Sequence, residues 1–315
     1  MTYIDIMGDP HLGKTFVHGV PLHRRGDREA MVWEAFRANL EAAESDLHVC
    51  VGDLFERPIV PYDAILKAAD IYRKVASDKP QTKFVILRGN HDCLVRDLER
   101  ASAFDLFARL VSDVPNIIVV SDVVMIDGYL FVGYDPVTPL ADRITEDHRA
   151  AKAAFFHAET EGYGKDFNVI PFERLAELDI RQVYNGHEHK PARCIKHGVD
   201  VTVVGSLQPY AHGEEIDDTL YVTLTLSELA TAGDLSKKCV RILLEPGETL
   251  DQEIDCLQLT IKRNADVEAE VGEVTLGEFD IDALFKQAFA EANVSEDLTN
   301  TMLQRFHERR LAGEV

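Results

Sequence analysis

Seven side chains of the types that bind divalent metals occur in five short clusters along the first two-thirds of the chain. The clusters read GDPHLG, GDLFERP, RGNHD, FFHAE and NGHEHK. The candidate metal ligands in them are Asp9, His11, Asp53, Asn90, His157, His187 and His189. Each cluster follows a short apolar run, so we expect the ligands at the ends of strands, where α/β sheets place their active sites.

The donor types favour two cations over one. The carboxylate of Asp53 is able to bridge neighbouring cations, Asn90 offers a neutral carbonyl oxygen, and imidazole suits Mn, Fe or Zn better than Mg. Two cations about 3.5–4 Å apart polarise a water molecule to hydroxide and hold phosphate oxygens for in-line attack. The pattern therefore predicts metal-assisted hydrolysis of a phosphate ester. His157 has the alternative interpretation of a core histidine, because its cluster has no defining spacing.

Two residues beside Asn90 are candidates for proton transfer. Metals supply the nucleophile, so the remaining need is a proton for the departing oxygen, and a histidine held by a carboxylate provides one near neutral pH. We therefore predict that His91 and Asp92 form a catalytic pair.

The composition fits an ordinary globular protein of about two domains, with 315 residues, 46% hydrophobic and 28% charged. No apolar run approaches the roughly 18 residues that a membrane span needs, and the N-terminal sequence does not resemble a secretory signal. Five scattered cysteines without a Cys-x-x-Cys pair suggest reduced thiols, so we expect a cytoplasmic protein.

The net charge of −22 argues against a protein that grips nucleic acid alone, because phosphate contacts supply most of that affinity. Residues 1–200 carry 24 Lys and Arg against 32 Asp and Glu, whereas residues 201–315 carry 9 against 23. The excess acid therefore lies mainly in the C-terminal third, away from the ligand clusters.

The clusters must be positioned by alternating strands and helices in the first 205 residues, a pattern typical of βαβ units. Helices are predicted over residues 27–44, 61–76, 101–110 and 139–152. From residue 196 onward strands dominate, and the tail has two amphipathic helical stretches, 280–292 and 296–311. We predict a catalytic domain over 1–205, a β-rich domain over 206–277 and a helix pair over 278–315.

At this point GDPHLG, GDLFERP, RGNHD and NGHEHK resemble the motifs of the calcineurin-like metallophosphoesterases. The similarity is greatest to the SbcD-type nucleases of DNA double-strand-break repair, including bacteriophage versions. Arg57-Pro58 after GDLF and the segment VVGSLQPY after the last histidines carry this narrower resemblance.

The resemblance implies an α/β sandwich of two sheets flanked by helices that holds two Mn²⁺, with Mg²⁺ or another divalent metal as an alternative. It also implies a small β-rich capping domain and a C-terminal helix pair that docks on an SMC-like ATPase of the SbcC type. The expected activity is exonuclease and endonuclease cleavage of DNA in recombination or end processing, and a homodimer is possible. The helix pair has the alternative of packing on its own protein.

One position departs from the family pattern, since Glu56 stands where many of these nucleases have histidine. Two interpretations of Glu56 are open. Either it changes the balance between exonuclease and endonuclease cleavage, or it only forms a salt bridge with Arg57. Basic residues near the motifs are candidates for contact with the DNA backbone: Lys14, His23, Arg24, Arg25, Arg57, Arg88 and Arg96. Tyr134, Tyr163 and Tyr210 are candidates for stacking on an unpaired base.

Two other functions compete with the nuclease. A stand-alone phosphodiesterase or phosphatase for a small molecule is compatible with the acidic composition, although it needs neither a β-rich cap nor a helical tail. A catalytically inactive scaffold of the same fold would lack ligands, and the sequence has all seven.

Overall fold

The computed structural model describes residues 3–94, 100–162, 166–217, 219–264, 286, 289 and 298–303. Contacts divide the chain into two units, Met1–Asn264 and Ala265–Val315, and the first is the subject below. Arg96, Tyr163 and most of the predicted C-terminal helix pair lie outside the described residues. Within the described part, no helix has the length and apolar character needed to cross a membrane.

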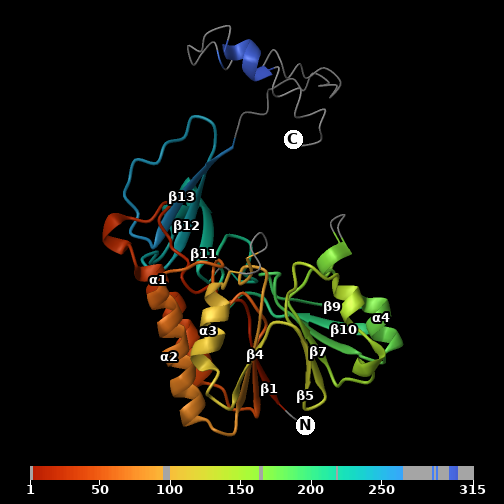
Figure 1. Cartoon of the computed structure of the whole chain (residues 1–315). Coiled ribbons are helices and arrows are strands. Elements are labelled where there is room, and N and C mark those ends of the chain that lie inside the picture. Colours follow the sequence, from red (N-terminus) through yellow and green to blue (C-terminus); the bar gives the residue numbers. More distant parts are fainter. Residues whose placement is uncertain are drawn as a thin grey trace. The chain divides into compact units, whose positions relative to one another are not determined.

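The first sheet contains four parallel strands in chain order, with one helix in each connection. The strands are β1 (Ile4–Met7), β2 (Leu47–Cys50), β3 (Lys83–Leu87) and β4 (Ile117–Val120). The helices are α1 (Asp27–Glu41), α2 (Tyr62–Asp78) and α3 (Ala103–Val111). All three helices lie on the same side of the sheet (Figure 1). The parallel strands therefore all end at the same edge, as repeated βαβ units require.

The second sheet is mixed and has the strand order β5-β6-β7-β8-β10-β9. Its strands are β5 (Val123–Ile126), β6 (Tyr129–Val132), β7 (Ala154–Phe156), β8 (Gln182–Asn185), β9 (Ala192–Lys196) and β10 (Val199–Val203). The central strands β6, β7, β8 and β10 are parallel, and the two outer strands pair antiparallel with their neighbours. Helix α4 (Phe172–Glu177) packs near β10.

Side chains alternate between layers along the strands. Val49, Val85, Phe131 and Phe155 belong to the core that the two sheets share, and the rings of Phe131 and Phe155 stack at 4.8 Å. The next residues along these strands point to the opposite face of each sheet. Ile86, which follows Val85, thus belongs to the core between the first sheet and its helices. The predicted α/β sandwich of two sheets flanked by helices is confirmed.

A third, smaller sheet follows the sandwich in the chain. It consists of the parallel strands β11 (Tyr221–Thr225), β12 (Cys239–Leu244) and β13 (Gln258–Arg263), with the short helix α5 (Leu226–Leu229) after β11. The segment after β1 joins its edge, because the backbone N–H of Leu259 donates to the carbonyl of Gly19 over 2.8 Å. This sheet lies in the predicted β-rich region, whose exact boundaries stay predictions.

The prediction of a helix over 139–152 was wrong. Two short 3₁₀ turns, Leu140–Arg143 and Glu146–His148, occupy that region. Thr145 and His148 form a capping box that starts the second turn, and Ala150 has a left-handed φ of 58° that ends it. Local side chain to backbone bonds therefore replace a continuous helix here. Strands β5 and β9 and helices α4 and α5 were not predicted, since each is a short element with weak periodicity.

A buried histidine of the sandwich predicts how its stability depends on pH. His48 in β2 is 1% exposed, its Nε2 lies 2.9 Å from Oδ1 of Asn39, and burial lowers its pKa to about 4. Between pH 6.5 and 4 the unfolded chain binds a proton at this histidine and the folded protein does not. The free energy of unfolding is therefore unaffected by His48 above pH 6.5 and decreases as the pH falls below it. We expect the titration of His48 to lower the free energy of unfolding by about 2 kcal/mol at pH 5 relative to pH 7.5.

The measurement is urea unfolding at pH 7.5 and pH 5 in the presence of a chelator, for the natural protein and for His48→Gln. The glutamine side chain does not titrate, so the variant should lose about 2 kcal/mol less between the two pH values. An identical loss in both proteins would contradict the assignment.

Candidate metal centre

The seven predicted ligands converge at one edge of the sandwich, although they come from both sheets. Asp9 and His11 follow β1, Asp53 follows β2 and Asn90 follows β3. His157 follows β7, and His187 and His189 follow β8. The carboxyl ends of these parallel strands meet there, which is where the sequence placed the ligands.

The ligands form two groups, and we call the first the His11–His189 pole. Nε2 of His11 and Nε2 of His189 lie 3.0 Å apart. Oδ2 of Asp9 is 3.9 Å from Nε2 of His189. One oxygen and two nitrogen donors therefore surround one point, as a single cation requires.

The second group is centred on the amide of Asn90, and we call it the Asn90 pole. The Oδ1 of Asn90 is 2.9 Å from Nε2 of His157 and 3.0 Å from Nδ1 of His187. His157 is 2% exposed and His187 is partly exposed. His157 is thus a buried histidine at the donor cluster, and not a core histidine away from it.

Asp53 lies between the two poles. Its Oδ2 is 3.7 Å from Nε2 of His11 and 3.3 Å from Nε2 of His157. Its Oδ1 accepts the backbone N–H of His91 over 2.9 Å. One carboxylate is therefore in reach of both donor groups, the arrangement expected of a bridging ligand.

The donor chemistry fits bound cations. Asp9 is fully buried, and its Oδ1 has no hydrogen-bond partner among the described residues. Burial raises the pKa of Asp9 to about 7, against the lowering effect of His157. Buried carboxylates are normally paired or bound to metals, so a divalent cation bound here would supply positive charge beside the buried carboxylates of Asp9 and Asp53.

The backbone at the ligands adopts conformations that side chains rarely take. His11, Asp53 and His187 have left-handed φ values of 47°, 47° and 70°. Such strain is concentrated at functional sites, where the surrounding structure enforces it. Gly52, with φ of 116°, adds a close approach, because a Cβ there would lie 2.2 Å from Nδ1 of His157. Gly52 in GDLFERP therefore leaves the space that the imidazole of His157 occupies.

The expected contact between His91 and Asp92 is replaced by a different arrangement. The fully buried carboxylate of Asp92 accepts the backbone N–H groups of Leu54, Phe55 and Gly89, at 3.1, 2.9 and 2.9 Å. Asp92 thus ties the loop that carries Asp53 to the loop that carries Asn90. The sequence placed the carboxylate correctly beside the site, but adjacency in the chain does not make adjacent side chains face each other.

His91 is oriented by a backbone carbonyl. Its Nδ1 lies 2.6 Å from the carbonyl oxygen of Glu56, which only accepts, so Nδ1 carries the hydrogen. The ring packs edge-on against His11 at 4.9 Å between centroids. Nε2 of His91 is consequently the ring nitrogen that carries the lone pair when the imidazole is neutral.

Glu56 pairs with Lys14 and His11. Its Oε1 is 2.8 Å from Nζ of Lys14, and its Oε2 is 3.2 Å from Nδ1 of His11. Burial raises the pKa of Glu56, but the contacts with His11 and Lys14 outweigh it and lower the pKa to about 2. The carboxylate is therefore ionised at neutral pH and adds negative charge behind a predicted metal ligand.

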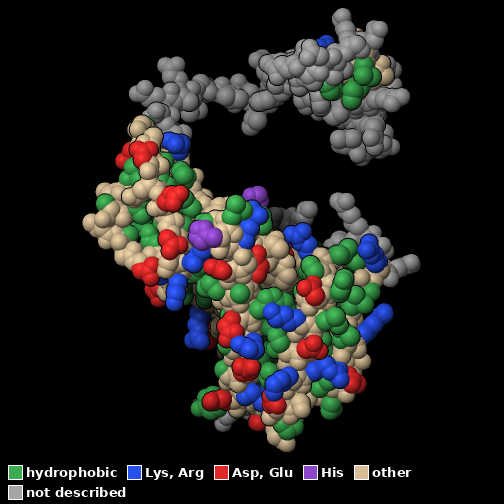
Figure 2. Space-filling model, turned by 90° about the vertical axis from the view of Figure 1, so that its left-hand side faces the viewer, with side chains coloured by type: hydrophobic (Ala, Val, Ile, Leu, Met, Phe, Trp, Pro, Cys, Tyr) green, Lys and Arg blue, Asp and Glu red, His purple; other side chains and the backbone are tan. Residues whose placement is uncertain are grey.

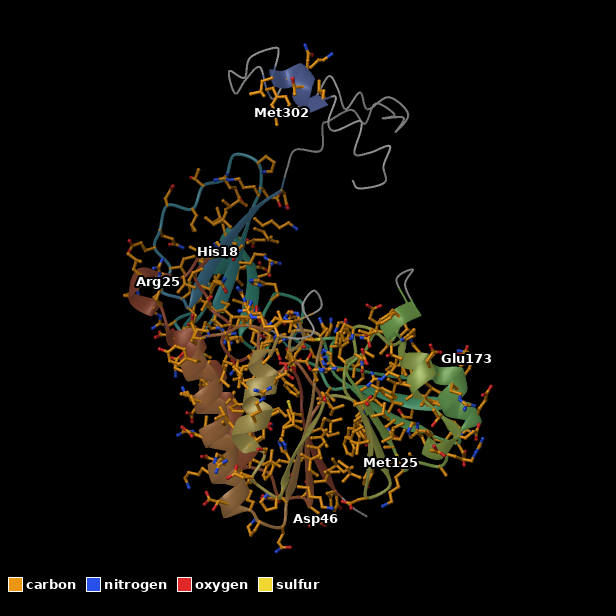
Figure 3. All side chains as sticks on the ribbon, viewed as in Figure 1. His18, Arg25, Asp46, Met125, Glu173 and Met302 are labelled. Atoms are coloured by element: carbon orange, nitrogen blue, oxygen red, sulfur yellow. The ribbon has the colours of Figure 1, made fainter. Side chains whose placement is uncertain are left out.

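The basic residues proposed for DNA contact are dispersed. Arg24 donates to the carbonyl of Ser236 and pairs with Asp27, beside the third sheet, and Arg25 lies in the same place (Figure 3). Arg88 donates to the carbonyl of Tyr134 over 2.8 Å. His23 and Arg57 are exposed. On the face seen in Figure 2 basic and acidic side chains are interspersed. Within the described part of the chain, Lys14 is the one residue of this set that pairs with a neighbour of a predicted ligand. Its partner is Glu56, which in turn contacts His11.

Two further residues reach the centre from beyond the last motif. Tyr210 packs edge-on against His11 at 5.2 Å and against His189 at 5.9 Å, so it lies in the wall of the metal centre. Its hydroxyl donates to the carbonyl of Pro10. Glu214 lies 3.2 Å from Nδ1 of His189. VVGSLQPY ends at Tyr210, but no local pattern in the sequence marks Glu214.

The close approach at Gly52 predicts the effect of one added methyl group. Gly52→Ala should weaken Mn²⁺ binding by at least about 10-fold, because the new Cβ displaces His157, and calorimetric titration measures this. Gly247→Ala is the matched control, since Gly247 also has a left-handed φ, of 82°, but open space around its Cβ position, and it lies after β12, in the third sheet. Equal losses of affinity in both variants would contradict the explanation.

Several known proteins are similar to parts of this chain. No curated protein matches the chain. Among solved structures, the protein TT1561 of Thermus thermophilus is similar at 17% identity and a TM-score of 0.41, covering 65% of this chain and 90% of that one. The nuclease MPE of Pseudomonas putida is similar at 16% identity and a TM-score of 0.33, covering 67% and 76%. The family model of the calcineurin-like phosphoesterases matches residues 2–191, and the chain therefore belongs to the calcineurin-like phosphoesterase family.

Proposed function

We propose that this phosphoesterase is a two-metal, Mn²⁺-dependent DNA nuclease. The observation that carries the two-metal part is Oδ2 of Asp53, which is in reach of His11 on one side and His157 on the other. A lone cation would need only one of the two poles. Mg²⁺ is the less suitable metal, because four of the seven donors are imidazoles.

Each pole would hold one ion, with Asp53 shared between them. Asp9, His11 and His189 would hold one ion, and Asn90, His157 and His187 would hold the other. Two bound cations would supply Lewis-acid activation of water and neutralise charge on the phosphate. His91 gives a proton to the departing oxygen from Nε2, while Asp92 positions the loops that carry Asp53 and Asn90.

The nuclease part rests on what surrounds the centre. The segment after β10 passes the ligands, since the N–H of Leu207 donates to the carbonyl of Asp9, and then leads into the third sheet. In the SbcD-type nucleases that the sequence resembles, such a sheet forms the capping domain. We propose that β11 to β13 fulfil that role and shape the DNA-binding surface.

The acidic composition suggests that the protein needs a partner to bind DNA. With a net charge of −22 the chain should bind DNA weakly by itself, so we propose that an SMC-like ATPase of the SbcC type supplies the remaining affinity, in the cytoplasm. DNA titrations at fixed salt, with and without such an ATPase, test this. Equal affinity in both would exclude the dependence on a partner.

A second function is supported by an acidic cleft of about 240 Å³ beside His189. Its lining includes Glu214, Glu215 and Asp217, together with Pro209 and Thr219. Such a surface repels a nucleic-acid backbone and suits a small substrate of lower negative charge. The alternative is therefore a stand-alone phosphodiesterase or phosphatase that acts on a small molecule.

Cleavage assays on two substrates separate these functions. The natural protein with Mn²⁺ is incubated with end-labelled linear DNA and, separately, with a chromogenic nitrophenyl phosphodiester. We expect cleavage of both, and loss of both in Asp53→Ala by at least about 100-fold, because both ions lose their shared ligand. Circular dichroism checks that the variant folds.

Hydrolysis of the chromogenic ester with intact DNA at every concentration would support the small-molecule enzyme. Full activity of Asp53→Ala on both substrates would exclude the two-metal mechanism.

The role of His91 predicts a dependence on the leaving group. The oxygen that leaves DNA is a poor leaving group and needs a proton, whereas nitrophenolate departs without one. His91→Gln should therefore slow DNA cleavage by about 100-fold and change nitrophenyl ester hydrolysis far less. The ratio of the two rates is the measurement, and equal slowing on both substrates would show that His91 acts in another way.

A further inference from the structure

We infer that Glu214 is a positioning residue of the metal centre that sets the proton arrangement of His189. This inference rests on the proposed metal centre, and it concerns a residue outside the segment 2–191 that matches the family. Glu214 is largely buried, with 21% of its side chain exposed.

The first contact fixes the tautomer of the imidazole. Oε1 of Glu214 is 3.2 Å from Nδ1 of His189, and an ionised carboxylate only accepts hydrogen bonds. The hydrogen of the neutral ring therefore resides on Nδ1. The lone pair of Nε2 then faces Nε2 of His11, 3.0 Å away, at the point where a cation would bind. Metal-bound histidines in proteins are commonly oriented by such an outer carboxylate.

The second contact connects Glu214 to the other ligands of the same pole. Its Oε2 accepts the backbone N–H of Tyr210 over 2.6 Å. The hydroxyl of Tyr210 donates in turn to the carbonyl of Pro10, the residue between Asp9 and His11 in the sequence. Glu214 and Tyr210 thereby connect His189 to the segment that carries Asp9 and His11, the other two predicted ligands of this pole.

The segment that carries both residues is itself held in place. The N–H of Ser206 donates to the carbonyl of His189 over 3.0 Å. The guanidinium of Arg28, which is 1% exposed, donates to Oε1 of Gln208 and to the carbonyl of Pro209, each over 3.0 Å. Because these bonds already fix the segment, holding the Glu214 side chain against His189 costs little further conformational entropy. Glu214 is therefore able to orient the imidazole of His189.

The effect is confined to one pole. Nδ1 of His157, in the Asn90 pole, lies 2.9 Å from the carbonyl oxygen of Val51, so a backbone group does there what Glu214 does for His189. Loss of Glu214 should therefore weaken one of two bound ions and leave the other unchanged. A general loss of structure would affect both.

The first test uses the metal-free protein. Long-range ¹⁵N–¹H correlation spectra of the histidine rings report the tautomer of each ring, and the signals of His189 are identified by their absence in His189→Gln. We expect the Nδ1–H form in the natural protein and a shift toward the Nε2–H form in Glu214→Ala. Glu214→Gln should retain the Nδ1–H form, because its amide oxygen still accepts.

The second test is calorimetric titration with Mn²⁺. Glu214→Ala should weaken one of two binding steps by about 10- to 100-fold, and Glu214→Gln should weaken it less. Glu215→Gln is the matched control, since it removes the same charge from the neighbouring residue, whose carboxylate accepts the N–H groups of Leu220 and Tyr221. That control should bind both ions normally.

An unchanged His189 tautomer in Glu214→Ala would overturn the inference, as would equal weakening in Glu215→Gln. Natural protein that cleaves no DNA, combined with the expected tautomer and titration results, would refute the nuclease and leave the role of Glu214 intact.

Discussion

The structure depends on holding seven electron-pair donors within a few ångströms of one another in a largely buried site. Asp9 and Asp53 are 0% and 2% exposed, and they lie 3.9 Å from Nε2 of His189 and 3.7 Å from Nε2 of His11, respectively. Burying unpaired charge of one sign is costly. Backbone N–H groups offset part of this cost, since those of His187 and His91 each donate to one of the two carboxylates. A pair of bound divalent cations would offset the remainder.

The local backbone follows from that constraint. Ligand loops from two different sheets must come together closely enough for their side chains to share ions, so glycines stand where a Cβ would collide with a ligand. A Cβ on Gly89 would lie 2.1 Å from Oδ1 of Asp53, and one on Gly186 would lie 2.6 Å from Oδ1 of Asp9. The same demand explains why Asp92 directs its carboxylate to three N–H groups of the ligand loops. Its contribution is to the position of the metal centre.

Two acidic side chains lie behind histidines of the His11–His189 pole. Glu56 places an ionised carboxylate behind His11, where a histidine would place a neutral or positive ring. Glu214 does the same behind His189. Both carboxylates lie at the same pole, and that of Glu56 is also paired with Lys14. The two poles therefore differ in the charged groups that surround their candidate ligands.

The sequence by itself determined the donor set, the strands that carry it and the family, because these features are local. Strand ends with Asp, Asn and His in fixed order need no distant information, and the short apolar runs predicted the strands that precede them. The sandwich of two sheets followed from the resemblance to the family. Short elements escaped prediction since a few residues carry little periodicity, and the 139–152 segment became two turns through local capping. Only the tertiary structure decided which side chains face each other. It turned Asp92 toward backbone N–H groups, paired Glu56 with Lys14, and brought Glu214 to His189 from 25 positions away. Contacts between residues far apart in the chain depend on how whole layers pack, and no short stretch of sequence encodes them.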